Sequence, residues 1–251
     1  MRMIHEKTVW QLTWMPRIFP VNAYLVEEED GLTLIDAALP YSAKGILEEA
    51  AHIGKPIVRI VLTHAHSDHI GAVDALKRAL PDAKLHISAR DARLLAGDRS
   101  LDAHEPSTAI RGGVPKPGKI AVEPDVLLRD GDRVGSLLAI ATPGHTPGSM
   151  SFLDTRNDAL IAGDAMQTRG GVAVSGQLKP WFPFPAMATW NKEEALASAR
   201  KLQALKPSLL AVGHGRMLSD PSQALDRAIA EAEQAIIKQR SAQPHVPENR
   251  S

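Results

Sequence analysis

The sequence predicts an α/β fold, and two observations support this prediction. In the first half, an apolar run at 57–63 is typical of a buried strand, and it is followed by an amphipathic helix at about 71–80 and an apolar strand at 84–88. In the second half, short apolar strands and helices recur, as expected if the chain folds into two similar layers. The chain has 251 residues, of which 44% are hydrophobic, and this is enough to bury a sizeable core.

The remaining elements follow from local patterns. Trp and Leu alternate with Gln and Thr at 10–14, which predicts a half-buried strand. Asn191, with Glu194 three residues later, resembles a capping box and predicts a helix to about Leu205, and the Asp-Pro pair at 220–221 predicts the start of the last helix. One more helix is predicted at about 43–52, and further strands are predicted at 22–27, 32–36, 125–128, 137–142, 149–153, 159–162 and 208–212.

Two segments rich in Gly and Pro, 97–119 and 166–188, are predicted to be irregular loops. No linker divides the chain, so a single domain over 1–240 is expected. The tail at 241–251 has little to bury and is predicted to be disordered.

Charge and composition exclude several classes of partner. The 29 Lys and Arg residues balance the 29 Asp and Glu residues, so the formal net charge is zero and neither a nucleic acid nor a membrane surface is expected as a partner. The amino terminus lacks the apolar core of a signal peptide, and no apolar stretch approaches the roughly 20 residues of a membrane span. We therefore expect a cytoplasmic protein.

The chain contains no cysteine and ten histidines, so any bound metal must be held by nitrogen and oxygen atoms. The segment THAHSDH at 63–69 lies where a predicted strand ends and a helix begins. His64 and His66 are two residues apart and point the same way on an extended backbone, and Asp68 and His69 follow in the turn. Burying so many imidazoles without a metal would be costly, so this segment predicts a metal site.

Three further candidates each follow a short apolar strand and lie beside glycine: His145, Asp164 and His214. Because α/β folds place functional side chains at strand ends, these residues are expected to join the first cluster. Together the set contains five His and two Asp, which suits two zinc-like ions if one carboxylate bridges them.

This set, read as His64-x-His66-x-Asp68-His69 followed by His145, Asp164 and His214, resembles the metallo-β-lactamase superfamily over about 36–214. The resemblance implies an αββα sandwich, in which two mixed β-sheets are flanked by helices and the metal site lies at the sheet edge. It also implies that one metal ion is held by His64, His66 and His145, that the other is held by Asp68, His69 and His214, and that Asp164 bridges the two.

Three carboxylates are identified through the same resemblance as catalytic: Asp68, Asp164 and Asp36. Asp36 matches an aspartate at an early strand end and is expected to orient the site from behind the ligands. The family usually has a glycine two residues later, where this chain has Ala38.

The chemistry implied is hydrolysis. Two divalent ions, with zinc expected and iron or manganese as alternatives, would lower the pKa of a shared water, and the metal-bound hydroxide would attack the carbonyl of a lactone, ester or thioester. Because a bridging aspartate is present and cysteine is absent, the chain resembles the glyoxalase II and lactonase-like branch. An oxidoreductase of the persulfide dioxygenase type, with a single iron, and a β-lactam or phosphodiester hydrolase remain as alternatives.

Aromatic residues indicate an apolar substrate. Phe19 lies in the loop at 15–21, and four more aromatic residues, Trp181, Phe182, Phe184 and Trp190, follow the bridging aspartate. We expect these five side chains to contact the substrate, which would be a small acyl compound. The chain is expected to be a monomer or a homodimer.

Overall fold

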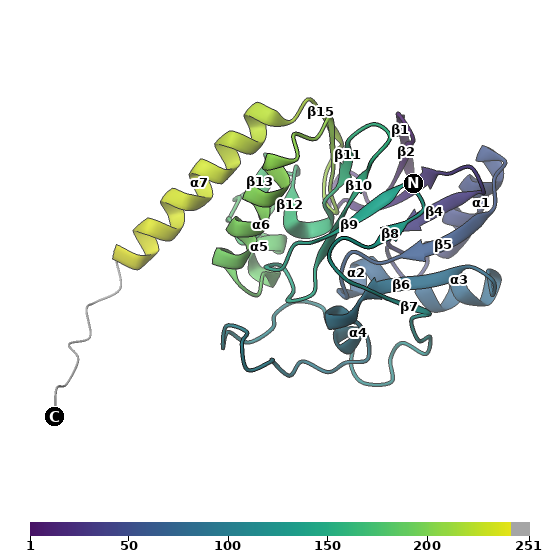
Figure 1. Cartoon of the computed structure of the whole chain (residues 1–251), viewed down its shortest axis with the longest axis horizontal. Coiled ribbons are helices and arrows are strands. Elements are labelled where there is room, and N and C mark those ends of the chain that lie inside the picture. The colour runs from purple at the N-terminus through teal and green to yellow at the C-terminus, as the bar shows by residue number, and fades with distance from the viewer. Residues whose placement is uncertain (242–251) are drawn as a thin grey trace.

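Two mixed β-sheets lie face to face between outer helices, as the computed structural model shows for residues 1–241 (Figure 1). The predicted αββα sandwich is therefore confirmed. The prediction for the carboxy-terminal tail concerns residues 242–251, which lie outside the described residues. Within 1–241, no helix is long and apolar enough to cross a bilayer.

The first sheet has seven strands in chain order. Its first four strands are antiparallel neighbours, and its last four pair in parallel. The strands are β1 (Arg2–Glu6), β2 (Val9–Trp14), β3 (Val21–Glu27), β4 (Leu32–Ile35), β5 (Ile57–Val61), β6 (Lys84–Ser88) and β7 (Val126–Leu128).

The second sheet has six strands in the order β15-β14-β11-β10-β9-β8, and only the β11–β14 pair is parallel. Its strands are β8 (Arg133–Val134), β9 (Leu137–Ala141), β10 (Met150–Asp154), β11 (Ala159–Ile161), β14 (Leu209–Ala211) and β15 (Leu218–Ser219). A separate short pair is formed by β12 (Met166–Gln167) and β13 (Ala173–Val174).

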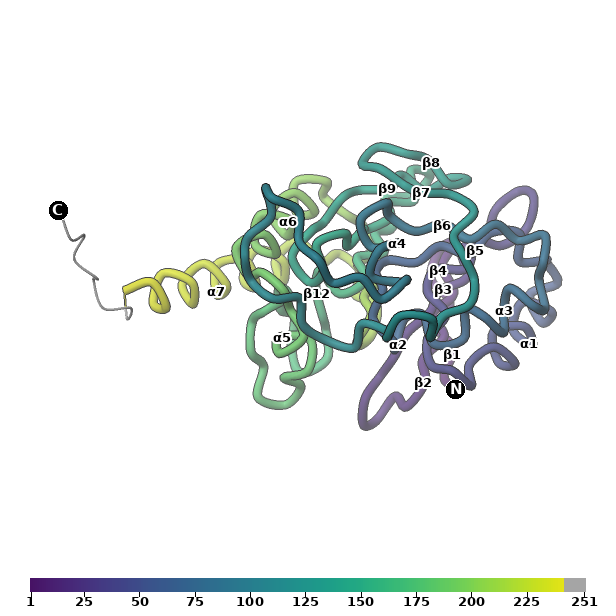
Figure 2. Tube along the Cα trace, turned by 90° about the horizontal axis from the view of Figure 1, so that it is seen from below, coloured from purple at the N-terminus to yellow at the C-terminus, as the bar shows by residue number. Residues whose placement is uncertain are grey.

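The helices divide between the two sides of the sandwich. Figures 1 and 2 place α1 and α3 beside the first sheet and α6 and α7 on the opposite side of the molecule. The segment between α4 and β7 runs below the sheets in Figure 1, on the side that faces the viewer in Figure 2, and contains no helix or strand, as predicted for 97–119. The helices are α1 (Ala43–Ile53), α2 (Ser67–Ile70), α3 (Val73–Ala79), α4 (Ala89–Leu95), α5 (Phe184–Ala188), α6 (Lys192–Ala204) and α7 (Ser222–Ser241), with a 3-10 turn η1 at Gly163–Ala165.

Three apolar clusters hold these layers together. One lies between the helices and the first sheet, one lies between the two sheets, and one lies between the second sheet and α6 and α7. Strand β3 shows how the sequence serves two clusters at once: Val21, Ala23 and Leu25 belong to the first, whereas Tyr24 and Val26 face the second sheet. Successive side chains on a strand point to opposite faces, so a strand between two cores is apolar on both.

Several elements differ from the sequence prediction. Strand β1 and helix α4 were not predicted, and the segment 166–188 contains short strands and α5. Strand β2 is more than half-buried, because Gln11 and Thr13 are also buried. Thr13 donates its hydroxyl to the side-chain carbonyl of Asn22 at 2.8 Å, so a polar residue can occupy the interior without losing its hydrogen bond.

The turn after β4 uses backbone conformations that are costly for ordinary residues. Asp36 has φ 61° and Ala38 has φ 50°, both in the left-handed region that favours glycine. The Ala38 carbonyl accepts a hydrogen bond from the amide of Gly71 at 2.8 Å, which ties this turn to the end of α2. The sequence therefore accepts strain next to Asp36 rather than relieving it with glycine.

We predict that Ala38→Gly is better tolerated than Ala37→Gly, its neighbour with ordinary backbone angles. Both variants lose one buried methyl group, worth about 0.8 kcal/mol, and gain freedom in the unfolded chain, worth about 0.4–1 kcal/mol. Only Ala38→Gly also relieves a left-handed conformation, worth about 1–2 kcal/mol. Urea denaturation should show Ala38→Gly close to the parent and Ala37→Gly less stable, and equal losses would contradict the strain argument.

Candidate metal centre

All seven predicted ligands meet at one edge of the sandwich, each carried by the segment that follows a strand. His64 and His66 follow β5, and Asp68 and His69 lie in α2 immediately afterwards. The other three come from the second sheet: His145 follows β9, Asp164 lies in η1 after β11, and His214 follows β14. All five imidazoles and Asp164 are buried.

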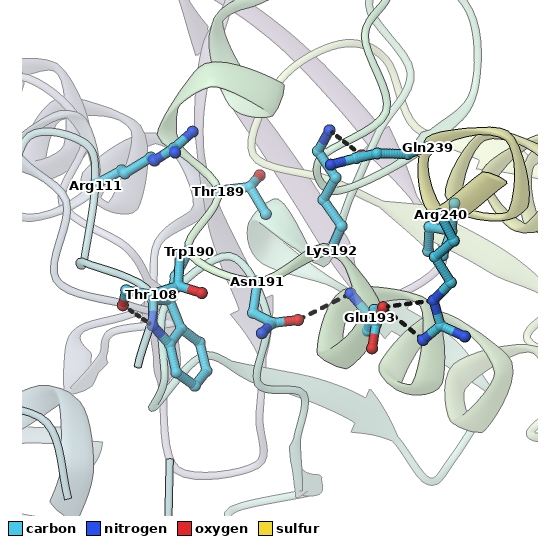
Figure 3. Close-up of a pocket in the computed structure, with 10 residues that line it drawn as sticks. Thr108, Arg111, Thr189, Trp190, Asn191, Lys192, Glu193, Gln239 and Arg240 are labelled. Atoms are coloured by element: carbon cyan, nitrogen blue, oxygen red, sulfur yellow. Dashed lines mark hydrogen bonds and ion pairs between the residues drawn. The ribbon is translucent and has the colours of Figure 1, made fainter. Parts of the chain in front are cut away.

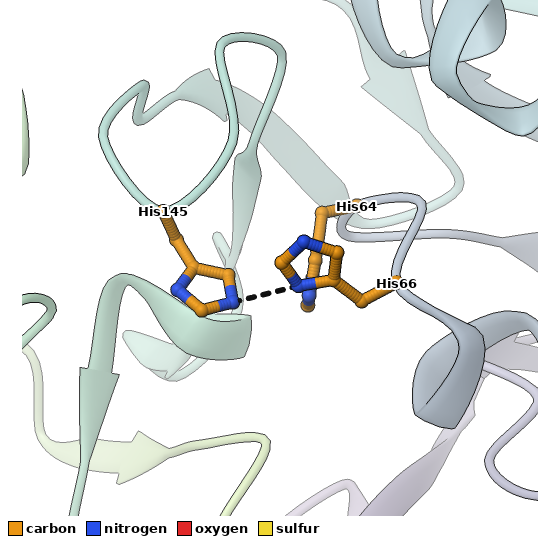
Figure 4. A group of neighbouring side chains, drawn as sticks. All are labelled: His64, His66 and His145. Carbon is orange, nitrogen blue, oxygen red and sulfur yellow. Dashed lines mark hydrogen bonds between the residues drawn. The ribbon is translucent and has the colours of Figure 1, made fainter. Parts of the chain in front are cut away.

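Three imidazoles form a first candidate site (Figure 4). Ligand atoms of His64, His66 and His145 lie within 4.8 Å of one another. The Nδ1 atom of His66 lies 2.9 Å from the Nε2 atom of His145, and the rings of His64 and His145 are nearly perpendicular. Three nitrogen atoms converging from two sheets match the ligand number of a zinc-type site.

A second group lies beside the first and contains ligand atoms of Asp68, His69 and His214. The Asp164 carboxylate lies between the two groups: its Oδ2 is 3.3 Å from His145 Nε2 and 3.2 Å from His214 Nε2, and its Oδ1 is 3.5 Å from His69 Nε2. The structure thus brings together the three members of each predicted triad and places the Asp164 carboxylate between the two groups.

The outward hydrogen bonds of the imidazoles fix where their protons lie. Asp36 and the Pro20 carbonyl can only accept, so the Nδ1 atom of His69 donates to Asp36 at 2.8 Å and that of His214 donates to Pro20 at 2.7 Å. Similarly, the Nε2 atom of His66 donates to the carbonyl of Arg111 at 3.0 Å.

The last two imidazoles are fixed through hydroxyl groups. The Thr63 hydroxyl donates to Asp36, so it accepts from the Nδ1 atom of His64 at 3.0 Å.

The proton position of His145 is fixed by a chain of hydrogen bonds through two hydroxyl groups. Thr189 donates to the carbonyl of Pro185, Ser175 then donates to Thr189, and the Nδ1 atom of His145 is left to donate to Ser175 at 3.0 Å. Each of the five rings therefore turns one N–H outward to a protein acceptor and its second nitrogen toward the centre of the site.

This inward arrangement fits metal ions. Inside the site, His64 Nε2, His69 Nε2 and Asp164 Oδ1 are buried and have no hydrogen-bond partner. Buried polar atoms are normally paired, and a cation at the centre of the site would supply these atoms with a partner. The donor set contains only nitrogen and oxygen, which suits zinc, iron or manganese.

The electrostatics point the same way. Burial lowers the pKa of His145 to about 3, and burial with the neighbouring imidazoles of His69 and His66 lowers that of His64, so both rings are neutral. Burial opposes ionisation of Asp164, but His214, His69 and His145 hold its pKa well below the usual range. Asp164 in turn raises the pKa of His69 and His214 against the effect of burial. The centre of the site thus attracts positive charge.

Asp36 stands directly behind the ligands, as predicted. Its Oδ1 accepts the Thr63 amide and its Oδ2 accepts the Thr63 hydroxyl, each at 2.8 Å, and the same Oδ2 accepts from His69. One carboxylate thereby orients His69 directly and His64 through Thr63.

The sequence did not predict a second buried carboxylate, Asp91. It accepts the amide of Ala65 at 3.0 Å, the amide of Gly148 at 2.8 Å and the hydroxyl of Thr146 at 2.7 Å, so it ties the loop of His64 and His66 to the loop of His145. Burial raises its pKa to about 6, although these hydrogen bonds act to lower it. The Ser-x-x-Asp pattern at 88–91 could have drawn attention to Asp91 in the sequence, because it is typical of a helix start, and the Ser88 hydroxyl does cap α4.

A buried polar network also holds the loop of His214. The side-chain amide of Asn22 donates to the carbonyls of Val212 at 2.7 Å and Gly215 at 2.9 Å, and the Tyr24 hydroxyl donates to Val212 at 2.6 Å. Gln11 adds a hydrogen bond to Gly215 at 2.9 Å. Strands β2 and β3 of the first sheet therefore fix a ligand that belongs to the second.

The five predicted substrate residues separate into two groups. Phe19 and Phe184 line a cavity of about 350 Å³ whose floor is formed by the metal-site residues. Phe182 is buried beneath them and packs on both Phe19 and His214.

Neither tryptophan lies in this cavity. Trp181 is 89% exposed, and Trp190 is buried in the core, where its indole N–H donates to the Thr108 carbonyl beside a separate cavity of about 390 Å³ (Figure 3). The positions of these two residues therefore differ from the predicted substrate-facing ones. Trp190 follows the extended backbone at Thr189, which ends α5.

The fold and the site define a class of α/β-sandwich proteins with a paired His/Asp metal centre. Residues 16–214 match the model of the metallo-beta-lactamase superfamily, and the chain belongs to this family. It is 60% identical over 92% of its length to "Uncharacterized protein YobT" of Bacillus subtilis (strain 168), covering 99% of that protein, and 32% identical over 77% of its length to "Probable metallo-hydrolase YflN" of the same organism, covering 80% of it.

A solved structure carries a metal pair. The crystal structure of TTHA1623 in a di-iron-bound form matches with a TM-score of 0.60 and 30% identity, over 85% of this chain and 96% of that one.

We predict that Gly213→Ala prevents normal metal binding. A Cβ atom at this position would lie 2.0 Å from Asp164 Oδ1 and 2.6 Å from His69 Cε1, so the Asp164 carboxylate would have to move. Gly45→Ala, in α1, is the matched control, because its nearest contact would be an ordinary 3.4 Å. Elemental analysis after dialysis should find less metal in Gly213→Ala and a full complement in Gly45→Ala. A full complement of metal in both variants would contradict the prediction, because the site would then bind metal even with Asp164 displaced.

Proposed function

We propose that the protein is a dinuclear metal-dependent hydrolase, with zinc as the metal, that acts on a lactone, ester or thioester. The observation that supports this most strongly is the orientation of the five imidazoles, each of which donates one N–H outward and turns its second nitrogen toward the centre of the site. The proposal includes a small-molecule acyl substrate and a monomer or homodimer, without nucleic acid or membrane as a partner.

The roles of the residues follow from their positions. His64, His66 and His145 would hold one ion, Asp68, His69 and His214 would hold the other, and Asp164 lies within reach of both groups. Two divalent ions there would lower the pKa of a shared water toward neutrality and polarise a carbonyl oxygen. Asp36 keeps His69 and His64 in the required orientation, and the apolar wall at Phe19 and Phe184 limits access of bulk water.

The cavity favours acyl substrates over strongly charged ones. Opposite the ligands, its wall is apolar and consists of Phe19, Phe184, Pro185 and Ala188. A bridging aspartate and the absence of cysteine support the glyoxalase II and lactonase-like branch within the family.

The mononuclear oxidoreductase alternative is less well supported. A single iron on two histidines and one aspartate would use only part of the donor set, and the remaining lone pairs would stay buried without a partner. The di-iron form of TTHA1623 makes iron a serious candidate for the metal itself, so metal identity belongs in the test.

We predict hydrolysis by the zinc-loaded protein in a screen over lactones, thioesters, aryl esters, phosphodiesters and β-lactams, with the acyl substrates turned over fastest. Elemental analysis should find about two zinc ions per chain. His66→Ala and Asp164→Ala should abolish turnover while circular dichroism shows a retained fold, because the outer hydrogen bonds of the other ligands remain. Parent-like rates in either variant, or a single iron with oxygen uptake, would contradict the proposal.

We predict that Phe184→Ala raises KM for an acyl substrate more than it lowers kcat, because Phe184 lines the cavity from α5, whereas Phe19 also packs against His214. Loss of a buried aromatic contact predicts an effect of roughly tenfold. Trp181→Ala is the matched control and should leave both constants unchanged, since this side chain is 89% exposed and outside the cavity. A stronger effect of Trp181→Ala than of the cavity variant would contradict the prediction, because it would place the substrate against the exposed Trp181.

A further inference from the structure

Three arginines line a cavity that the hydrolytic site does not use. Arg2, Arg169 and Arg216 contribute to a cavity of about 450 Å³. It shares the loop at 15–20 with the metal-site cavity, since Phe19 lines the latter while Pro16 and Pro20 line the former. None of the metal ligands lines the arginine cavity, so the two spaces are separate.

These arginines lack the acidic partners that other arginines of the chain possess. Arg59 pairs with Asp30 and Arg90 pairs with Glu105, for example. Over residues 1–241, no carboxylate lies within 4.0 Å of a guanidinium nitrogen of Arg2, Arg169 or Arg216.

Their hydrogen-bonding capacity is also largely unused. The Arg169 guanidinium donates one bond, to the carbonyl of Arg17 at 2.6 Å. The Nε atom of Arg2 is shielded from solvent and has no partner. Burial lowers the pKa of Arg2, and the nearby charge of Arg216 lowers it further, so the fold holds like charges together at a cost.

The backbone of the cavity leaves room for a ligand beside these charges. Gly170, Gly171 and Gly215 are on its wall, and a Cβ added at Gly171 would have its nearest neighbour at 3.9 Å. A volume of about 450 Å³ lies in the range of small-molecule sites, roughly 300–1,000 Å³, and exceeds what a single inorganic ion fills.

We propose that this cavity binds a small molecule with a diphosphate group. Each phosphate of such a group has about one to two negative charges, so the total of about three matches the three guanidinium groups. Guanidinium is the side chain best suited to phosphate, because its planar fork donates two parallel hydrogen bonds. Thr168 and Gly215 line the cavity, and the backbones of both residues lie beside His214. Binding of a diphosphate in this cavity requires no metal ion.

Titration calorimetry of the metal-loaded protein with inorganic pyrophosphate tests this directly. Saturable binding is expected, weakened roughly tenfold or more by each of Arg169→Gln and Arg216→Gln, because each removes a charge-assisted hydrogen bond. Arg78→Gln is the matched control: Arg78 is exposed on α3, outside the cavity, and its substitution should leave the affinity unchanged. Thermal melting confirms that each variant is folded.

Two further arms identify the site and the chemistry. His66→Ala should still bind pyrophosphate, and loss of binding in that variant would place the anion at the metal centre and overturn the proposal. Citrate, which has carboxylates in place of phosphates, should bind more weakly than pyrophosphate. Tighter binding of citrate would show that the cavity prefers carboxylates and would overturn the proposal. No saturable binding, or equal binding by the Arg169→Gln and Arg216→Gln variants and the parent, would also overturn it. None of these outcomes depends on whether the protein hydrolyses acyl compounds.

Discussion

The direction of five imidazole protons is the constraint on which the rest of the site depends. Each ring donates one N–H to a fixed acceptor outside the centre, and its other nitrogen faces the centre of the site. A histidine that could rotate or change tautomer would not hold a ring nitrogen in a fixed position toward a metal ion. The outer acceptors therefore leave the inner nitrogens of this cluster available to cations.

Those acceptors come from nearly every part of the sandwich. Asp36 follows β4, Pro20 precedes β3, Ser175 follows β13, and Arg111 belongs to the long segment between α4 and β7. Asp91 adds a link between ligand loops that come from different sheets. The geometry of the centre is thus a property of the packed layers, and this explains why a motif of only seven residues at 63–69 could not hold it alone.

The ligands could be predicted from the sequence because they lie close together in it or recur in one context, a short apolar strand that ends at a polar residue beside glycine. The supporting residues could not. Asp91 acts through partners far away in the chain, and Asn22 looks like an ordinary strand residue until the loop of His214 packs against it. Trp190 follows Phe184 closely in sequence, yet the extended backbone at Thr189 directs it into the core. Proximity in sequence decides side-chain direction only within one continuous element.

The outer hydrogen bonds do not need the metal, and this has a thermodynamic consequence. His64 Nε2, His69 Nε2 and Asp164 Oδ1 are buried without hydrogen-bond partners, and leaving a buried polar group unpaired costs about 1–3 kcal/mol. The outer hydrogen bonds orient the ligands, and bound cations would supply the three unpaired atoms with partners. Metal affinity and the stability of the metal-free fold are consequently opposed: a substitution that gives the inner atoms hydrogen-bond partners would stabilise the fold and weaken the centre.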